Sequence, residues 1–382
     1  MRRIGLLAMA GACVLGAQPA GADDFRRPGT ISQIDQTLQS ALASQGLPPR
    51  DATIVADVVV ATTMIVASMG CSGTTAAAAA GAAAGAAAGA AVSPTAAFSC
   101  PVFAGGTLLL GEDGCLWGAV SGQWTSQGSG DAAGTSRAAV FRAGGQTQVA
   151  DGWFVGGFLG VGFASGQAGG GYVSNSGQTY DAGLSLKRVQ GPWLLAAGLA
   201  FGATVNSLQR EAGQITGSTA SYGGSLRLRG AHELAFDGWY LRPRLDLELR
   251  YFNRPAFQES GGSGLAMAFG GESTLRPAFV PALELGARID AADGTILRPY
   301  LVAGATVLPD SSSGFQTWFV GGPLASLGTF QAPQTGPTVL ATVEAGLQIY
   351  RAHGFEAKAA HGPSTGATWL SQSATLRGAW HF

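Results

Sequence analysis

The sequence predicts an all-β protein: a closed antiparallel transmembrane β-barrel of about 12 strands, preceded by a short, mostly helical and low-complexity N-terminal region. Three observations carry this prediction. Apolar and polar residues alternate in long segments after residue 115, aromatic residues lie near the ends of these segments, and the chain ends on an aromatic residue. Successive side chains of a strand point to opposite faces, so the alternation gives each strand one apolar and one polar face.

Residues 241–251 show this alternation most clearly. The odd positions are apolar, and the even positions carry the charged side chains Arg242, Arg244, Asp246, Glu248 and Arg250. A helix would spread both classes around its circumference, so a period of two excludes it. A barrel in lipid can place charge only in its lumen, and we therefore predict that these five side chains line the lumen. An acid–base pair of Asp246 and Glu248 is disfavoured, because the neighbouring arginines balance their charge.

The chain begins with the features of a cleaved signal peptide. Two arginines precede an apolar stretch from residue 4 to about residue 17, and residues 20–22 form the small-residue pattern of a cleavage site. We interpret residues 1–22 as a signal peptide, 23–100 as the N-terminal region and 101–382 as the barrel domain. A lipoprotein anchored at Cys13 is a weaker interpretation, because the apolar run continues past that cysteine.

Three segments make up the N-terminal region. Residues 30–45 place their apolar side chains on one stripe, as an amphipathic helix does. Residues 52–69 are nearly all apolar with a single Asp57, and residues 76–91 are an alanine tract with glycine at every fourth position. One of the last two segments is a candidate helix in the barrel lumen, and a flexible linker is an equally open interpretation of 76–91. An inner-membrane helix at 52–69 is disfavoured, because the chain has to cross the inner membrane.

Cys71, Cys100 and Cys115 remain after removal of the signal peptide. In an oxidising compartment, Cys100 and Cys115 can close a short loop and leave Cys71 unpaired. Three unpaired thiols fit the sequence as well.

The barrel strands are expected at residues 115–127, 135–149, 153–165, 177–189, 192–206, 217–235, 238–253, 273–290, 295–309, 336–351, 354–362 and 367–382. Lengths of about ten residues or more suit a tilted strand that crosses a membrane. Turn-forming clusters separate the runs, among them 175–177, 237–238, 293–294 and 311–314. We expect an interfacial aromatic girdle formed by Trp117, Trp124, Trp153, Trp193, Trp239, Tyr240, Tyr251, Phe252, Tyr300 and Tyr350.

The last residues carry a further signal. Leu376, Trp380 and Phe382 share one face, with aromatic residues at the last and third-last positions. This pattern resembles the terminal strand by which bacterial outer-membrane barrels are recognised for insertion, and it predicts that role for these three residues.

Residues from about 110 to 382 resemble the autotransporter β-domain of type V secretion. The likeness rests on Leu116-Trp117-Gly118, Gly191-Pro192-Trp193, the segment 238–243 and the closing segment 374–382. It implies a twelve-stranded barrel in the outer membrane of a Gram-negative bacterium, with a helix in its lumen, that tethers or exports an N-terminal passenger. It also implies outer-membrane lipid, the barrel assembly machinery and periplasmic chaperones as partners. The candidate passenger, 23–110, is very short and contains no repeated β-helix coils.

Several functions are not expected. A net charge of −1 gives no reason to expect a nucleic-acid partner. The four histidines lie at no metal-ligand spacing, and no hydrolase, zinc-protease or nucleotide-loop motif is present, so we expect no enzyme, no cofactor and no metal. The alternatives are a channel or porin-like barrel plugged by its N-terminal segment, a structural or adhesive surface protein without transport activity, and a soluble secreted β-sandwich.

Overall fold

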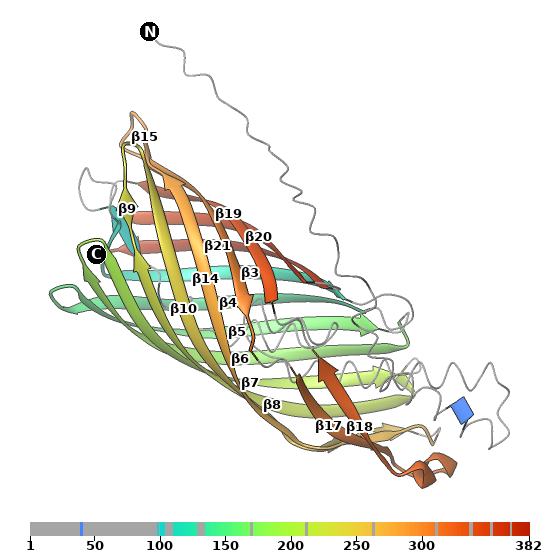
Figure 1. The fold of residues 1–382 in the computed structure, drawn as a ribbon. Helices are drawn as coiled ribbons and strands as arrows, with labels where there is room; N and C mark the ends of the chain where they lie inside the picture. Colours follow the sequence, from blue (N-terminus) through green and yellow to red (C-terminus); the bar gives the residue numbers. More distant parts are fainter. Residues whose placement is uncertain are drawn as a thin grey trace.

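The computed structural model describes residues 39–40, 98, 100–103, 110–127, 134–168, 171–210, 213–261, 264–309, 312–335, 339–351, 354–366 and 369–382. Twelve long strands form one closed barrel (Figure 1). They are β3 (Cys115–Gln127), β4 (Gly134–Ala150), β5 (Trp153–Ala168), β6 (Val173–Gln190), β7 (Trp193–Arg210), β8 (Ile215–His232), β10 (Trp239–Arg254), β14 (Glu272–Ala287), β16 (Ile296–Val307), β19 (Val339–Arg351), β20 (Phe355–Gly366) and β21 (Trp369–His381).

Antiparallel pairing continues around the whole barrel. The last strand, β21, pairs with the first, β3, from His381 opposite Cys115 to Trp369 opposite Gln127. Each of the twelve strands therefore has two neighbours, and their backbone polar groups find partners without water. The predicted all-β fold and closed twelve-stranded barrel are confirmed, and the predicted strand bounds lie within about four residues of the observed ones.

The outer face of the barrel is apolar. On β10, Leu247 is 40% exposed, whereas its lumen-facing neighbours Asp246 and Glu248 are at most 3% exposed. Large exposed apolar side chains occur on all twelve barrel strands, for example Leu159 on β5 and Leu376 on β21. A soluble protein does not leave so large an apolar surface uncovered, so this face is suited to lipid.

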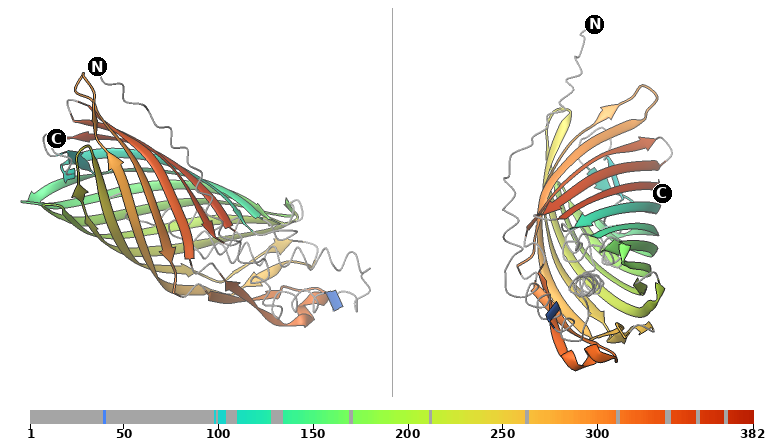
Figure 2. Two further views of the ribbon diagram at one scale, coloured as in Figure 1. Left: turned by 45° about the horizontal axis from the view of Figure 1, so that its top comes forward. Right: turned by 90° about the vertical axis from the view of Figure 1, so that its right-hand side faces the viewer.

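The two ends of the barrel differ (Figure 2). At one end, here called the turn end, tight turns join the strands, and Gly238 and Gly294 adopt φ values of +80° that other residues rarely adopt. In the second of these turns, Asp293 accepts a hydrogen bond from the amide of Thr295, which holds the pKa of this exposed carboxyl below its usual value. Each of these two connections also carries a short strand, β9 (Leu234–Ala235) in the first and β15 (Ile289–Asp290) in the second.

At the opposite end, here called the loop end, two long connections pair with each other. They carry β11 (Phe257–Gln258), β12 (Ser260–Gly261), β13 (Met267–Phe269), β17 (Ser312–Phe319), the 3-10 helix η6 (Pro323–Leu327) and β18 (Thr329–Thr335). Strands β11, β13, β17 and β18 form a separate four-stranded sheet, with Phe269 and Phe315 buried in it. The alternation of apolar and polar residues does not predict this sheet.

Two predicted turns are wrong. Residues 175–177 lie within β6, and residues 312–314 of the cluster 311–314 lie in β17, whereas the turns at 237–238 and 293–294 are confirmed. Asn175 pairs with Gly166 on one side and Leu208 on the other. Backbone hydrogen bonds to strands on both sides outweigh the local preference of Asn, Ser and Gly for a turn.

Half of the predicted aromatic girdle is also wrong. Trp124, Trp193, Trp239 and Tyr251 are at least 42% exposed on the outer face, but five others are at most 8% exposed and face the lumen: Trp117, Tyr240, Phe252, Tyr300 and Tyr350. A position near a strand end does not decide the face; the parity of the position along the strand decides it.

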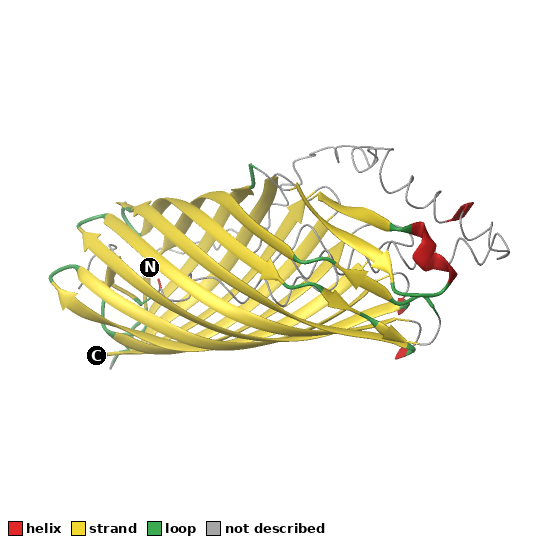
Figure 3. Ribbon diagram, turned by 90° about the horizontal axis from the view of Figure 1, so that it is seen from below, coloured by secondary structure: helices red, strands yellow, loops and turns green. Residues whose placement is uncertain are grey.

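Before the barrel, the structure describes a short hairpin of β1 (Pro101–Phe103) and β2 (Leu110–Glu112). Of the predicted helix at 30–45, only residues 39 and 40 lie among the described residues, and both are helical. This helical segment lies at the loop end, away from the C-terminus (Figure 3). The predicted segments 1–22, 52–69 and 76–91 lie outside the described residues. None of the described helical segments has the length and hydropathy of a membrane-spanning helix.

Candidate functional site in the barrel lumen

The five predicted lumen residues lie on β10 and share its inner face. Asp246, Glu248 and Arg250 are buried, and Arg242 and Arg244 are half-buried. They lie beside β8 and β14, where Asp246 is opposite Arg229 and Arg242 is opposite Glu284. The alternation that predicts a polar face on each strand therefore brings opposite charges together across neighbouring strands.

Asp246 is the centre of the first ion-pair cluster. Its two carboxylate oxygens accept hydrogen bonds from Arg229 Nε at 2.7 Å and Arg229 Nη2 at 2.8 Å, and Arg227 Nη2 lies 3.1 Å away. Glu248 accepts a hydrogen bond of 2.7 Å from Arg250 Nη2. Buried charges of this kind need close partners, because desolvation penalises each of them.

Glu284 on β14 is the centre of the second cluster. It accepts hydrogen bonds from the hydroxyl of Tyr240, at 2.8 Å, and from Arg298 Nη2. Arg242 Nη1 lies 3.7 Å from the same carboxylate, and Arg242 Nε donates to Glu233 at 2.9 Å. The inner walls of β10, β14 and β16 are thus cross-linked by charge-assisted hydrogen bonds.

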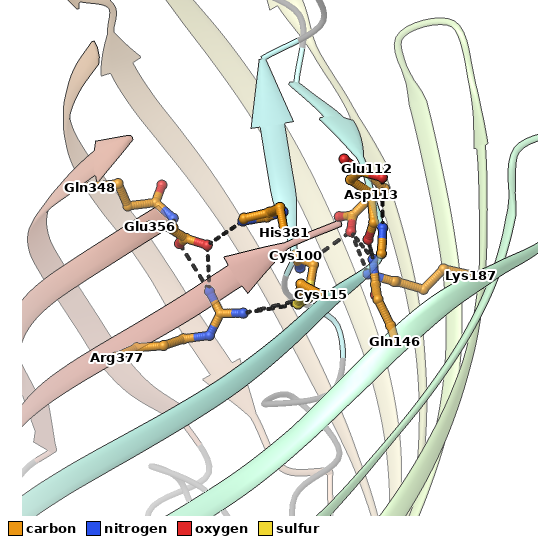
Figure 4. Close-up of a disulfide and its surroundings, with 11 residues drawn as sticks. Cys100, Glu112, Asp113, Cys115, Gln146, Lys187, Gln348, Glu356, Arg377 and His381 are labelled. Carbon is orange, nitrogen blue, oxygen red and sulfur yellow. Dashed lines mark hydrogen bonds and ion pairs between the residues drawn. A yellow bond between two sulfur atoms is a disulfide. The ribbon is translucent and has the colours of Figure 1, made fainter. Parts of the chain in front are cut away.

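A third cluster lies near the turn end, where the chain enters the first barrel strand (Figure 4). Glu112 on β2 accepts hydrogen bonds from Lys187 Nζ at 2.6 Å, Gln146 Nε2 at 2.9 Å and the backbone amide of Cys100 at 3.3 Å. A disulfide joins Cys100 to Cys115, so the pairing that the sequence left open is formed. Together these contacts attach the β1–β2 hairpin to β3, β4 and β6.

The last strand completes this cluster. Arg377 Nη1 donates to both carboxylate oxygens of Glu356 at 2.9 Å, and its Nη2 lies 3.6 Å from the Sγ atom of Cys100. Glu356 also accepts from Gln348 Nε2 at 2.9 Å and lies 3.3 Å from His381 Nε2. The disulfide therefore lies beside the junction where β21 meets β3.

Phe98, Pro101 and Glu112, which precede the first barrel strand, lie inside the barrel. Phe98 is 4% exposed, and the guanidinium of Arg229 lies 5.2 Å from the centre of its ring. Phe98 and Glu112 line the same lumen cavity, of about 460 Å³, as Arg227, Arg244 and Asp246. Cys100, two residues after Phe98, is likewise buried.

The predicted insertion residues lie on the outer face of β21 and at its end. Leu376, Trp380 and Phe382 are 61%, 55% and 67% exposed. The backbone amide of Phe382 donates to the carbonyl of Gly114 at 3.0 Å, so the terminus lies against the start of the first strand. Their exposure is compatible with contact to lipid, and their role in insertion stays a prediction.

Sequence reasoning missed the partners of these side chains. Lys187, Glu284 and Glu356 occupy the polar face of predicted strands, but nothing in the alternation indicates which residue on another strand each one contacts. At the loop end it also missed Arg210, whose Nε donates to Glu259 at 2.9 Å with both side chains fully buried. Among the described residues, no group of acidic, histidine or cysteine side chains is arranged to hold a metal ion.

A closed barrel of twelve antiparallel strands with an apolar outer face and a charged lumen defines a transmembrane β-barrel protein. A sequence model of the autotransporter β-domain matches residues 116–360. The chain belongs to the autotransporter β-domain family and forms a translocator-type barrel of the outer membrane of Gram-negative bacteria. No curated protein sequence matches it.

Solved structures of autotransporter barrels are similar in fold. The translocator domain of the autotransporter NalP from Neisseria meningitidis has a TM-score of 0.57 at 14% identity, covering 71% of this chain and 89% of that one. The transport unit of AIDA-I from Escherichia coli has a TM-score of 0.55 at 12% identity, covering 75% and 96%. The β-domain of the Bordetella autotransporter Brka has a TM-score of 0.53 at 17% identity, covering 71% and 100%.

Proposed function

We propose that this barrel anchors and exposes a short segment of its own chain, the N-terminal region 23–100, at the cell surface. A signal peptide at residues 1–22 directs the chain out of the cytoplasm and is then removed. Periplasmic chaperones and the barrel assembly machinery deliver the barrel to the outer membrane, with Leu376, Trp380 and Phe382 as the insertion signal. The proposal includes no enzymatic activity, because the carboxylates of the three lumen clusters are held by arginine or lysine.

One observation carries the proposal: Phe98 and Glu112, described residues that precede β3, lie in the lumen. Phe98 packs under Arg229 of β8, and Glu112 is held by Lys187 of β6. A chain that stayed on the periplasmic side would have no reason to bury an aromatic ring and a carboxylate among lumen charges. If the N-terminal region has passed through the barrel, the residues that follow it, such as Phe98, lie in the lumen.

The position of residues 39–40 supports the same path. This helical segment lies at the loop end, the end of the barrel that carries β17 and β18 (Figures 1 and 2). In bacterial barrels the short turns face the periplasm and the longer loops face the outside. A path from residue 40 outside to Phe98 inside leads through the barrel.

Trypsin added to intact cells tests this path. Between residues 28 and 136 the chain contains Arg50 as its single arginine and contains no lysine. We expect cleavage after Arg50 on intact cells, giving a barrel fragment that begins at Asp51, and no such fragment from an Arg50→Gln variant. Cleavage at Arg50 only after permeabilisation of the outer membrane would refute surface exposure.

A plugged channel is the second candidate, and the lumen cavity of about 460 Å³ favours it. The two functions differ in conductance. A large steady conductance of the full-length protein in planar bilayers indicates a channel, whereas a closed barrel that opens only when residues 23–100 are deleted supports the anchor.

A further inference from the structure

Arg244 differs from the other arginines of the lumen cavity, because no described residue forms a hydrogen bond or ion pair with it. Its side chain lines the cavity, and its Nε atom is buried without a hydrogen-bond partner. The register explains this lack of a partner. Arg244 is opposite Ala231 on β8 and Ala282 on β14, and neither methyl group can accept a hydrogen bond.

The nearby carboxylates are already held by other arginines. Asp246 accepts two hydrogen bonds from Arg229, and Glu284 accepts from Arg298 and Tyr240. Glu233 accepts from Arg242, Glu248 accepts from Arg250, and Glu344, which also lines the cavity, accepts from Tyr300. Arg244 therefore adds a positive charge that the described wall does not balance.

An unbalanced guanidinium at a partly buried position attracts an anion. Its planar set of N–H donors fits the oxygen pair of a carboxylate or phosphate, and the low-dielectric barrel wall strengthens the attraction relative to water. The alanines on both sides leave room, and the cavity that Arg244 lines is large enough for a phosphate ion or a carboxylate side chain.

We propose that Arg244 is an oxyanion-binding site of the lumen, occupied by a carboxylate or phosphate group. That group has two possible sources: a free anion from solution, or a carboxylate of this chain's own N-terminal region. In the second case the choice is narrow, because Asp51 and Asp57 are the only acidic residues between positions 41 and 97. Asp51 adjoins the bond that trypsin is expected to cut from outside, so the proposed path leaves Asp57 as the candidate. The second source rests on the proposed path of the chain through the barrel, and the first does not.

The test measures the temperature at which the full-length protein, folded in detergent, loses its heat-modifiable gel migration. Each variant is measured in phosphate and in chloride at equal pH and ionic strength. The variants are Arg244→Gln, the double variant Asp51→Asn/Asp57→Asn, and the combination of all three. Arg137→Gln is the matched control, since Arg137 lies on the outer face and its Nε donates to Ser165 at 3.1 Å.

If a free anion is the source, phosphate at a few times its Kd for the site raises the midpoint of the wild type by about 2–4 °C. It raises the midpoint of Arg137→Gln by the same amount and leaves that of Arg244→Gln unchanged. The chain's own carboxylate is the source if phosphate leaves the wild type unchanged, stabilises the Asp51→Asn/Asp57→Asn variant and loses this effect when Arg244→Gln is added. The proposal is overturned if phosphate raises the midpoints of Arg244→Gln and Arg137→Gln by the same amount, or raises the midpoint of no variant. Trypsin cleavage at Arg50 reports the path of the chain separately, so the two proposals can fail independently.

Discussion

Replacing Glu112 by glutamine is the sharpest test of how the chain is held in the lumen. Lys187 is fully buried, and Glu112 is its one ion-pair partner among the described residues, at 2.6 Å. Glutamine keeps the shape and an oxygen that accepts a hydrogen bond, but it removes the negative charge. The change therefore leaves a buried ammonium without a counter-charge and otherwise preserves the site.

The size of the effect follows from that burial. Removing one partner of a buried ion pair costs about 3–5 kcal/mol, and the amide oxygen that remains places this variant near the lower value, about 3 kcal/mol. At about 2–4 °C per kcal/mol for a domain of this size, the midpoint of unfolding should fall by about 6–12 °C. The double variant Glu112→Gln/Lys187→Gln should recover most of this loss, since two amides can form a neutral hydrogen bond.

Heat-modifiable gel migration of the purified barrel measures both midpoints. Asp290→Asn is the control: it also removes one carboxylate from an ion pair, with Arg288, but its side chain is 61% exposed, so a loss below about 1 kcal/mol is expected. A midpoint of Glu112→Gln within about 2 °C of the wild type would refute the reasoning. So would a double variant no more stable than the single one.

Three further predictions concern other parts of the barrel. Without reductant, Cys100 and Cys115 should resist a thiol reagent, and after unfolding and reduction both should react; their reaction in the unreduced, unfolded protein would contradict the disulfide. Leu247→Arg, which places a charge on the outer face near the middle of β10, should cost about 2–4 kcal/mol and lower the folded fraction in membranes, whereas Leu247→Met should be tolerated. Glu259→Gln should make the 255–271 connection sensitive to protease on intact cells, because Arg210 loses its buried partner, while the barrel itself keeps its heat-modifiable migration; an equally resistant connection would contradict this.

For most of the barrel wall, the alternation of apolar and polar residues predicted which side chains face outward and which face the lumen. On β10 it separates Leu247 from Asp246 and Glu248, and the structure has the same separation. This succeeds because a barrel in lipid allows only one orientation of each strand: a shift by one residue would bring the lumen-facing charges of that strand into the membrane. The turns with aspartate and glycine at 237–238 and 293–294 were predictable for a local reason, since glycine there adopts a positive φ.

Other features did not follow from local pattern. Asn175 and Ser312 belong to sequences typical of turns, yet both lie in strands because neighbouring strands pair with them. Tyr240 and Tyr300 were expected among the interfacial aromatics but face the lumen, where each hydroxyl donates to a carboxylate, Glu284 and Glu344 respectively. In both cases contacts between strands overrode what the residue type alone suggested.

The sequence by itself determined that this protein is a lipid-facing barrel of twelve strands. The membrane requires an apolar outer face on every strand, and this requirement gives the sequence its alternation with a period of two. Only the tertiary structure decided which charges meet in the lumen. Glu112 and Lys187 come from separate parts of the chain, as do Cys100 and Arg377, and the folded barrel brings each pair together. It likewise decided that Arg244 lies between two alanines and has no described partner. Such contacts depend on strand register and on barrel closure, which are properties of the whole sheet and not of any one strand.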